Sequence, residues 1–257
     1  MKNQRKSLAS GLLTAALVAA VMFGGAALAA AQEQEEVLHS FGKGTDGRFP
    51  EAGLIIDSKG NLYGTTGGGG AYSYGTVFEL TPKAGGRWTE KVLHSFNYNG
   101  KDGVDPYAGL IFDTAGSLYG TTSGGGAYSY GTVFELTPKA SGGWTEKVLH
   151  SFNENGNDGY NPQQASLILD AAGNLYGTTP FGGPLGGCSG LGCGTVFELT
   201  PKAGGLWTEK VLHSFSDNGT DGYDPWAGLI LDTAGHLYGT TYFGGASGGG
   251  TVFEIKP

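Results

Sequence analysis

The sequence has few cysteines, few basic residues and no membrane-length hydrophobic run beyond Ala31. Two cysteines in 257 residues exclude a disulfide-dense scaffold and a multi-cysteine metal centre. Lysine and arginine number only 15 against 23 acidic residues, so neither nucleic acid nor an anionic membrane is expected as a partner. The part of the chain after Ala31 also lacks a helical period and a second apolar stretch, which argues against helices and against a membrane span.

The segment 1–31 has the pattern of a targeting signal. Lys2, Arg5 and Lys6 precede an apolar run from Leu8 to about Ala27, and small residues continue to Ala31. This pattern is typical of a cleaved signal peptide and predicts export, to the periplasm or the extracellular space. Residues 32–257 are then expected to form a single domain, in which 12 basic and 23 acidic residues give a formal charge of −11.

Glycine, by contrast, is abundant, with 50 residues. The glycines recur at equivalent positions of a sequence unit that occurs four times. Glu79, Glu135, Glu198 and Glu254 mark equivalent positions, and the interval from Glu135 to Glu198 is longer than the other two because the third copy carries an insertion. Each copy holds short runs rich in β-branched and aromatic residues, bounded by Gly, Pro, Asp or Asn. Such runs predict strands, and in the second copy they are residues 109–111, 118–122, 132–136 and 144–152.

Four strands per unit, repeated four times, predict an all-β fold in the form of a four-bladed β-propeller. Residues 37–41 repeat the last run of the unit but stand alone before the first complete copy. We therefore expect them to pair with residues 251–255 as the outer strand of the last blade, which would close the ring and cover two strand edges. The alternative is an open array of β repeats, for which distinct capping repeats are typical.

The stretch from Gly60 to Pro82 carries a long motif, Gly-Asn-Leu-Tyr-Gly-Thr-Thr and then Gly-Thr-Val-Phe-Glu-Leu-Thr-Pro, which returns in the later copies. It closely resembles the bacterial GloVer tandem repeat, and the resemblance covers residues 36–257. That family consists of exported repeat proteins with a choice of surface anchors, so the resemblance implies an extracellular or cell-surface setting but no activity or site residues. The shorter Asp-x-x-Gly-Asn-Leu-Tyr motif is similar to blades of NHL and gluconolactonase-like propellers.

Two kinds of loop are expected to share one face of such a propeller: those before the first strand of each unit and those between its second and third strands. These loops differ between the copies and carry aromatic residues among Gly, Asn and Asp. Because aromatic rings offer large contact areas, we predict a recognition surface there, although the same rings could simply fill space between loops. The candidate ligand-binding residues are Tyr107, Tyr160, Tyr223, Trp226, Tyr72, Tyr128, Tyr242 and Phe243.

The recurrent histidines, represented by His94, are interpreted as hydrogen-bonded packing residues within a strand. By strict alternation His94 would share its face with Trp88, Val92 and Phe96, among others. Glu79 is expected to face Lys91 across a hairpin. No nucleophile elbow, His-Glu-x-x-His pair or phosphate-binding loop occurs, so no catalytic residue is assigned.

The third and fourth copies hold the remaining candidates. Cys188 and Cys193 lie in the insertion and predict a local disulfide in an exported chain. Asp217, Asp221 and Asp224 offer oxygen ligands of the kind that calcium prefers, but their spacing misses the EF-hand rule and favours a turn stabilised by Asp. We therefore expect neither a metal nor another cofactor, with calcium as the alternative.

Together these observations predict a secreted β-propeller repeat protein that is a non-catalytic binding or scaffold module. Its expected partner is an extracellular glycan or protein, bound by the aromatic loop face. Two alternatives stay open: a propeller-type hydrolase or lyase of the lactonase or glycan-cleaving kind, whose acids would come from several blades, and a purely structural envelope protein.

Overall fold

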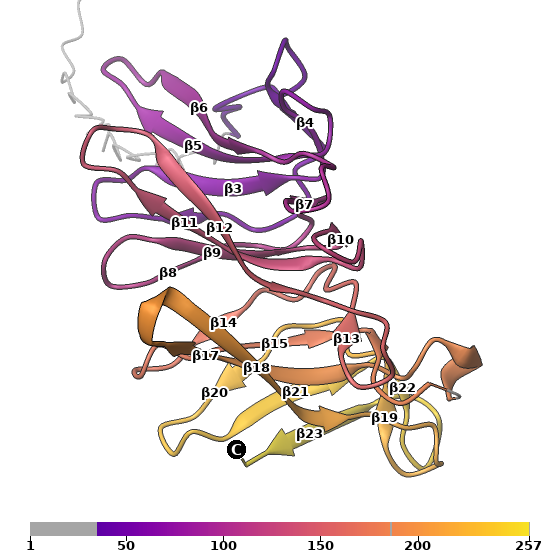
Figure 1. Ribbon diagram of the computed structural model, residues 1–257. Coiled ribbons are helices and arrows are strands. Elements are labelled where there is room, and N and C mark those ends of the chain that lie inside the picture. Colours follow the sequence, from indigo (N-terminus) through magenta and orange to yellow (C-terminus); the bar gives the residue numbers. More distant parts are fainter. Residues whose placement is uncertain (1–34, 186, 257) are drawn as a thin grey trace, which may run out of the picture. The chain divides into compact units, whose positions relative to one another are not determined.

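Each repeat forms one antiparallel sheet whose strands are hydrogen-bonded to their neighbours in sequence order. The computed structural model describes residues 35–185 and 187–256, so the predicted targeting segment lies outside the described residues. The regular structure in these ranges is β apart from two single 3₁₀ turns, η1 (Cys188–Gly190) and η2 (Ala203–Gly205), which confirms the all-β class (Figure 1). The sheets are β2 (Ile55–Ile56), β3 (Leu62–Thr66), β5 (Thr76–Pro82) and β6 (Trp88–Ser95); β8 (Ile111–Phe112), β9 (Leu118–Thr122), β11 (Thr132–Pro138) and β12 (Trp144–Ser151); β14 (Ile168–Leu169), β15 (Leu175–Thr179), β17 (Thr195–Lys202) and β18 (Leu206–Ser214); and β20 (Ile230–Leu231), β21 (Leu237–Thr241) and β23 (Thr251–Ile255).

An aspartate fixes the tight turn between the first two strands of every sheet. In the first sheet Asp57 Oδ1 accepts hydrogen bonds from the backbone N–H groups of Lys59 and Asn61, at 2.8 and 2.9 Å. The Tyr63 hydroxyl donates to Asp57 and to Glu79, at 3.2 and 3.1 Å. Burial acts to raise the pKa of Asp57, but the hydrogen bonds from Asn61 and Lys59 outweigh it and lower that pKa. The recurring aspartate is therefore a structural residue, and Asp57 stays ionised.

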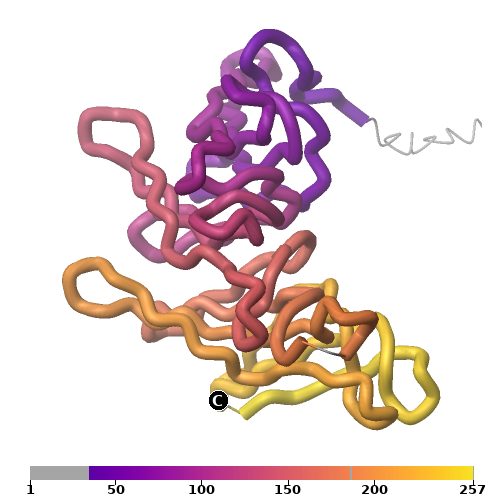
Figure 2. Tube along the Cα trace, turned by 45° about the vertical axis from the view of Figure 1, so that its right-hand side comes forward, coloured from indigo at the N-terminus to yellow at the C-terminus, as the bar shows by residue number. Residues whose placement is uncertain are grey.

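The third and fourth strands of the first three sheets form long hairpins, two of which extend clearly from the chain trace in Figure 2. Glu79 lies opposite Lys91, which confirms the predicted register. The register shifts between Val77 and Phe78, where β6 contributes one extra residue, and the same shift occurs in the two later hairpins. Strict alternation along β6 is therefore wrong for His94, because a bulge interrupts the strand just before it.

Four two-stranded sheets join the loop in front of each large sheet to the loop between its second and third strands. The two kinds of loop thus lie together, which agrees with the alternation of loops expected from the sequence. The pairs are β1 (Gly47–Arg48) with β4 (Gly68–Gly69), β7 (Gly103–Val104) with β10 (Gly124–Gly125), β13 (Gly159–Tyr160) with β16 (Phe181–Gly182), and β19 (Gly222–Tyr223) with β22 (Phe243–Gly244).

Gly103 shows why glycine is needed where these loops meet the large sheets. A Cβ atom there would lie 2.3 Å from Thr122 Oγ1 and 2.6 Å from Thr132 Oγ1. These two threonine hydroxyls are buried and hydrogen-bonded to each other at 2.8 Å. The same threonine pair faces the equivalent glycine in the other three repeats, so the close approach is a property of the repeat.

The core consists of apolar side chains packed between consecutive sheets. The first two sheets enclose Tyr63, Val77 and Phe96 on one side and Leu118 and Phe134 on the other. Equivalent clusters lie between the second and third sheets and between the third and fourth. Each inner sheet therefore has two apolar faces, one for the preceding repeat and one for the following repeat.

The predicted ring closure is absent from the described residues. Strand β23 is hydrogen-bonded to β21 only, residues 37–41 form no strand, and none of the described sheets closes on itself, so a four-bladed propeller is not confirmed. Residues 37–41 are held elsewhere, because the Phe41 ring packs edge-on against Phe78 of β5, with 4.9 Å between centroids. The described residues include no helix with the length and apolar character needed to cross a membrane.

Candidate functional site

The loops of the third and fourth repeats bring aromatic rings into contact. Tyr160 and Phe181 are cross-strand partners in the β13–β16 pair, with their centroids 5.6 Å apart. Tyr223 and Phe243 are the equivalent partners in β19–β22 and stack at 5.4 Å. Phe181 in turn packs edge-on against Trp226 at 5.9 Å. Aromatic side chains of two consecutive repeats thus lie in contact with one another.

A cavity of about 400 Å³ lies against these rings and is called the aromatic cleft here. It is lined by the rings of Trp226, Tyr242 and Phe243 and by the polar side chains of Asp224 and Gln164. Tyr242 and Phe243 adjoin each other edge to face, with centroids 4.5 Å apart, and both are exposed to solvent. The cleft therefore combines accessible aromatic faces with two hydrogen-bonding side chains.

The backbone holds Asp224 in a defined position at the wall of the aromatic cleft. Its φ of +56° lies in the left-handed region, its N–H donates to the Cys193 carbonyl at 3.1 Å, and its own carbonyl accepts from the Tyr242 N–H at 3.0 Å. Burial raises the pKa of its carboxyl group. The equivalent residues Phe49, Asp105 and Asn161 share the left-handed conformation, so the repeat fixes the backbone while the side chain varies.

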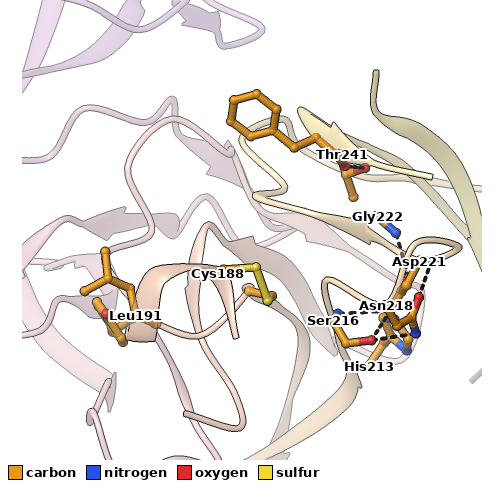
Figure 3. The surroundings of a disulfide bond; sticks show 11 residues. Cys188, Leu191, His213, Ser216, Asn218, Asp221, Gly222 and Thr241 are labelled. Carbon is orange, nitrogen blue, oxygen red and sulfur yellow. Dashed lines mark hydrogen bonds and ion pairs between the residues drawn. A yellow bond between two sulfur atoms is a disulfide. The ribbon is translucent and has the colours of Figure 1, made fainter. Parts of the chain in front are cut away.

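The predicted disulfide between Cys188 and Cys193 is present and stabilises the insertion of the third repeat. Figure 3 shows it beside the loop in which Asp221 accepts hydrogen bonds from the backbone N–H groups of Ser216 and Gly222. A second cavity of about 320 Å³ lies between the insertion and this loop. Its lining shares Asp224 and Phe243 with the aromatic cleft, so the insertion flanks the same site.

The eight predicted ligand-binding residues separate into two groups. Trp226, Tyr242 and Phe243 line the aromatic cleft, and Tyr223 lines the adjoining cavity with Phe243. The other four do not line the cleft. Tyr160 is buried, and its hydroxyl donates a hydrogen bond to the Leu191 carbonyl at 2.9 Å. Tyr107 lines a separate cavity with Glu51. Tyr128 is exposed beside His150, and Tyr72 is exposed in the loop of the first repeat.

The three candidate calcium ligands have different surroundings. Asp217 lines the cavity beside the disulfide, and Asp224 belongs to the aromatic cleft. Asp221 accepts hydrogen bonds from the Ser216 N–H and lies 3.2 Å from His213 Nε2. Within the described ranges the one group of three His, Asp or Glu side chains with ligand atoms inside 4.8 Å of one another is His94, Asp102 and Glu146.

That group belongs to a recurring cluster which the sequence interpretation missed. His94 Nε2 lies 3.0 Å from Asp102 Oδ2 in the loop that follows its strand, and Glu146 comes from the outer strand of the next sheet. His150 and Asp158 repeat the 3.0 Å contact, and His39 and Asp46 have it as well. The recurring spacing of seven or eight positions between His and Asp was the available signal. These histidines are hydrogen-bonded, as predicted, but their partners are acids across a loop.

The buried carboxyl group of the glutamate in each cluster lacks hydrogen bonds that would offset the cost of its burial. Oε1 of Glu146 and Oε1 of Glu209 are buried without a hydrogen-bond partner, and so are Oδ1 of Asp102 and Oδ1 of Asp158. Burial, and after it the charge of the neighbouring aspartate, raises the pKa of Glu146 and that of Glu209 to about 7, although the nearby histidine opposes this. The clusters can therefore take up protons near neutral pH at the contacts between repeats.

The fold and this site define an all-β tandem-repeat protein with an aromatic cleft in its loops. A family model, the Gloeobacter/Verrucomicrobia repeat, matches residues 25–186 and 88–257. The chain belongs to this repeat family, which confirms the GloVer resemblance of its motif. No curated protein matches the chain.

Proposed function

We propose that the chain is an exported, non-catalytic binding module that holds a neutral carbohydrate in the aromatic cleft. The observation that carries this proposal is the lining of one 400 Å³ cavity by Trp226, Tyr242 and Phe243 together with Asp224 and Gln164. Cavities of about 300–1,000 Å³ are the usual size for small-ligand sites.

The chemistry of the lining suits a sugar. The C–H faces of a pyranose ring pack against aromatic rings, and its hydroxyl groups need hydrogen-bond partners at the edge of the ring. Gln164 can both donate and accept hydrogen bonds, and the Asp224 carboxylate can accept them from hydroxyl groups. The acidic composition, with 23 acidic and 15 basic residues, disfavours an anionic polysaccharide.

Two observations support export. Residues 1–31 have a basic start, an apolar run and small residues at the end, as cleaved signal peptides do. The Cys188–Cys193 disulfide is of a kind that persists in oxidising compartments, such as the periplasm and the extracellular space.

Binding is favoured over catalysis by the position of the acidic groups. The cluster of His94, Asp102 and Glu146 joins the outer strands of two neighbouring sheets, and two of its oxygens are buried. The aromatic cleft contains one carboxylate, from Asp224, whereas glycoside hydrolysis generally needs a pair of carboxyl groups flanking the bond.

The test is an array of neutral oligosaccharides and polysaccharides, followed by titration of the best binder. We expect the variants Trp226→Ala and Tyr242→Ala to lose at least about tenfold in affinity, which corresponds to about 1.4 kcal/mol and is modest for a truncated aromatic contact.

The matched control is Tyr72→Ala, because Tyr72 is 53% exposed and Tyr242 is 66% exposed, but only Tyr242 lines the cleft. The control should bind as tightly as the unmodified chain. The proposal would be wrong if no carbohydrate bound, or if affinity survived both cleft substitutions.

A further inference from the structure

The three contacts between consecutive sheets are copies of one junction. In each, a phenylalanine at the end of the outer strand packs edge-on against a phenylalanine of the next sheet. The centroid distances are 5.1 Å for Phe96–Phe134, 5.2 Å for Phe152–Phe197 and 5.1 Å for Phe215–Phe253. Each junction consists of one face from the preceding sheet and one face from the following sheet. The first and last sheets of the chain can therefore be compared with the internal junctions, one face at a time.

The last sheet presents one half of this junction, and no other described part of the chain covers it. Val77, Val133 and Val196 are 0% exposed where they face the following repeat, whereas the equivalent Val252 is 83% exposed. Ile230 beside it is also exposed, and these two side chains line an apolar cavity of about 300 Å³. Strand β23, labelled in Figure 1, is the last strand of its sheet, and its outer edge pairs with no other described strand. The apolar surface and this free edge are together called the trailing face.

The first sheet presents the other half. Leu54 is 50% exposed, whereas its equivalents Leu110, Leu167 and Leu229 are at most 4% exposed. Ile56 is exposed next to it. Residues 37–41 already lie on this surface, since Phe41 packs on Phe78 at 4.9 Å as Phe96 packs on Phe134. Leu54, Ile56 and residues 37–41 form the leading face.

We propose that the trailing face of one copy of this chain binds the leading face of a second copy, with residues 37–41 of the second copy added to β23 as a fourth strand. The internal hairpins give the register. Val77 lies opposite His94 and Phe78 opposite Val92, so Val252 would lie opposite the second copy's His39 and Phe253 opposite its Val37. An unpaired strand edge is a ready template for such strand addition.

The His–Asp–Glu clusters support the same register. Glu90, Glu146 and Glu209 each stand four positions before a histidine, and in the sequence Glu35 stands four positions before His39. His213 and Asp221 have no such glutamate in the fourth sheet, and their side chains are 40% and 24% exposed, against 20% and 9% for His150 and Asp158. The second copy's Glu35 would complete this fourth cluster.

One position of the added strand carries a different charge. Glu79 faces Lys91 within the chain, but Glu254 would face Glu36 of the second copy. Glu254 already has basic side chains beside it, since Lys256 Nζ and His236 Nδ1 each lie 3.3 Å from its carboxylate. These neighbours offset the like charges.

A second copy is the occupant that the structure favours. Both faces are exposed in residues 35–185 and 187–256, so within these ranges the two ends of the array do not cover each other. Docking of a second copy repeats the internal junction without moving any sheet against its neighbour. Such an interface is heterologous and either grows into a chain of copies or closes into a ring of copies.

The test is sedimentation velocity of the purified protein over a wide range of concentration. The leading-face variant is Ile56→Glu, the trailing-face variant is Val252→Glu, and the control is Leu206→Glu, whose native residue is 69% exposed in the hairpin of the third sheet. We expect the unmodified chain and the control to associate with rising concentration. Each face variant should associate at least about tenfold more weakly, so that it is still monomeric at concentrations where the unmodified chain has associated.

Mixing the two face variants gives the sharpest result. Each supplies the face that the other lacks, so an equimolar mixture should form a dimer and nothing larger. A monomeric unmodified chain would overturn the proposal. For a monomeric chain, the melting temperatures of the variants decide what replaces the proposal. If both face variants melt at a lower temperature than the control, the two faces pack against each other within one chain. If they melt at the same temperature as the control, neither face has a partner.

Discussion

The buried glutamates between the repeats predict a loss of stability as the pH rises from 5 to 8. Glu146 and Glu209 have pKa values of about 7 in the folded chain, against an ordinary value of 4.5. A pKa raised by folding means that the folded state binds protons more tightly than the unfolded state. The stabilisation is complete below about pH 4.5 and is lost as the pH rises through about 7.

The magnitude follows from the separation between the two pKa values. Each pKa unit is worth about 1.4 kcal/mol, so a change from 4.5 to about 7 gives an upper value of about 3–4 kcal/mol for each glutamate. Water reaches part of both side chains, which reduces this to roughly 1–2 kcal/mol each. The double variant Glu146→Gln, Glu209→Gln should therefore remove about 2–4 kcal/mol of the pH dependence.

Urea denaturation at pH 5, 6, 7 and 8 measures the effect directly. Asp57 and Asp170 have lowered pKa values and titrate below this range, and the other carboxyl groups are common to both proteins. We expect the double variant to be more stable than the unmodified chain at pH 8, with the difference in stability becoming steadily smaller towards pH 5. The exposed residue Glu51 supplies the control variant, Glu51→Gln. An equal pH dependence in the double variant and the unmodified chain would refute the reasoning.

Three further perturbations test the packing. Gly103→Ala places a Cβ 2.3 Å from Thr122 Oγ1 and should lower the free energy of unfolding, measured in urea, by about 1–3 kcal/mol. The control Gly249→Ala meets no atom within 4 Å and should leave stability unchanged. Equal losses of stability in the two variants would contradict the close approach at Gly103. Replacing Cys188 and Cys193 by Ser removes a link between positions five apart and should lower stability by about 2 kcal/mol, and a thermal melt insensitive to the change would contradict a stabilising role. Asp57→Ala removes the acceptor of two backbone N–H groups and should cost about 1–2 kcal/mol, which unchanged urea denaturation would disprove.

The sheet of each repeat could be predicted because its determinants are local. The runs 118–122, 132–136 and 144–152 became strands or parts of strands, and the run 109–111 overlaps β8 at Ile111. These runs were predictable because β-branched residues, turn aspartates and glycines all specify the same short-range geometry. The disulfide was predictable for the same reason, because Cys188 and Cys193 are near neighbours in one inserted loop.

The contacts between repeats could not be predicted in this way, because they join residues far apart in the sequence. Nothing near Glu146 in the sequence indicates that it meets His94, on the outer strand of the preceding sheet, and Asp102, in the loop that follows that strand. The motif of residues 37–41 also does not reveal whether this segment pairs with β23 or packs on Phe78. In the complete repeats, the outer strand that carries this motif is hydrogen-bonded to its own sheet and its final Phe packs on the next sheet, so the motif is compatible with both positions. Aromatic composition alone likewise did not separate Trp226, in the cleft, from the buried Tyr160.

Oxidative footprinting of the aromatic side chains, with and without the best-binding oligosaccharide, tests the proposed cleft most directly. Mass spectrometry of the digested protein reports the oxidation of each ring separately. We predict that the ligand protects Trp226 and Tyr242, which line the cleft, and leaves the exposed Tyr72 and Tyr128 unchanged. Protection of Tyr72 or Tyr128 without protection of Trp226 would contradict a carbohydrate site at this cleft.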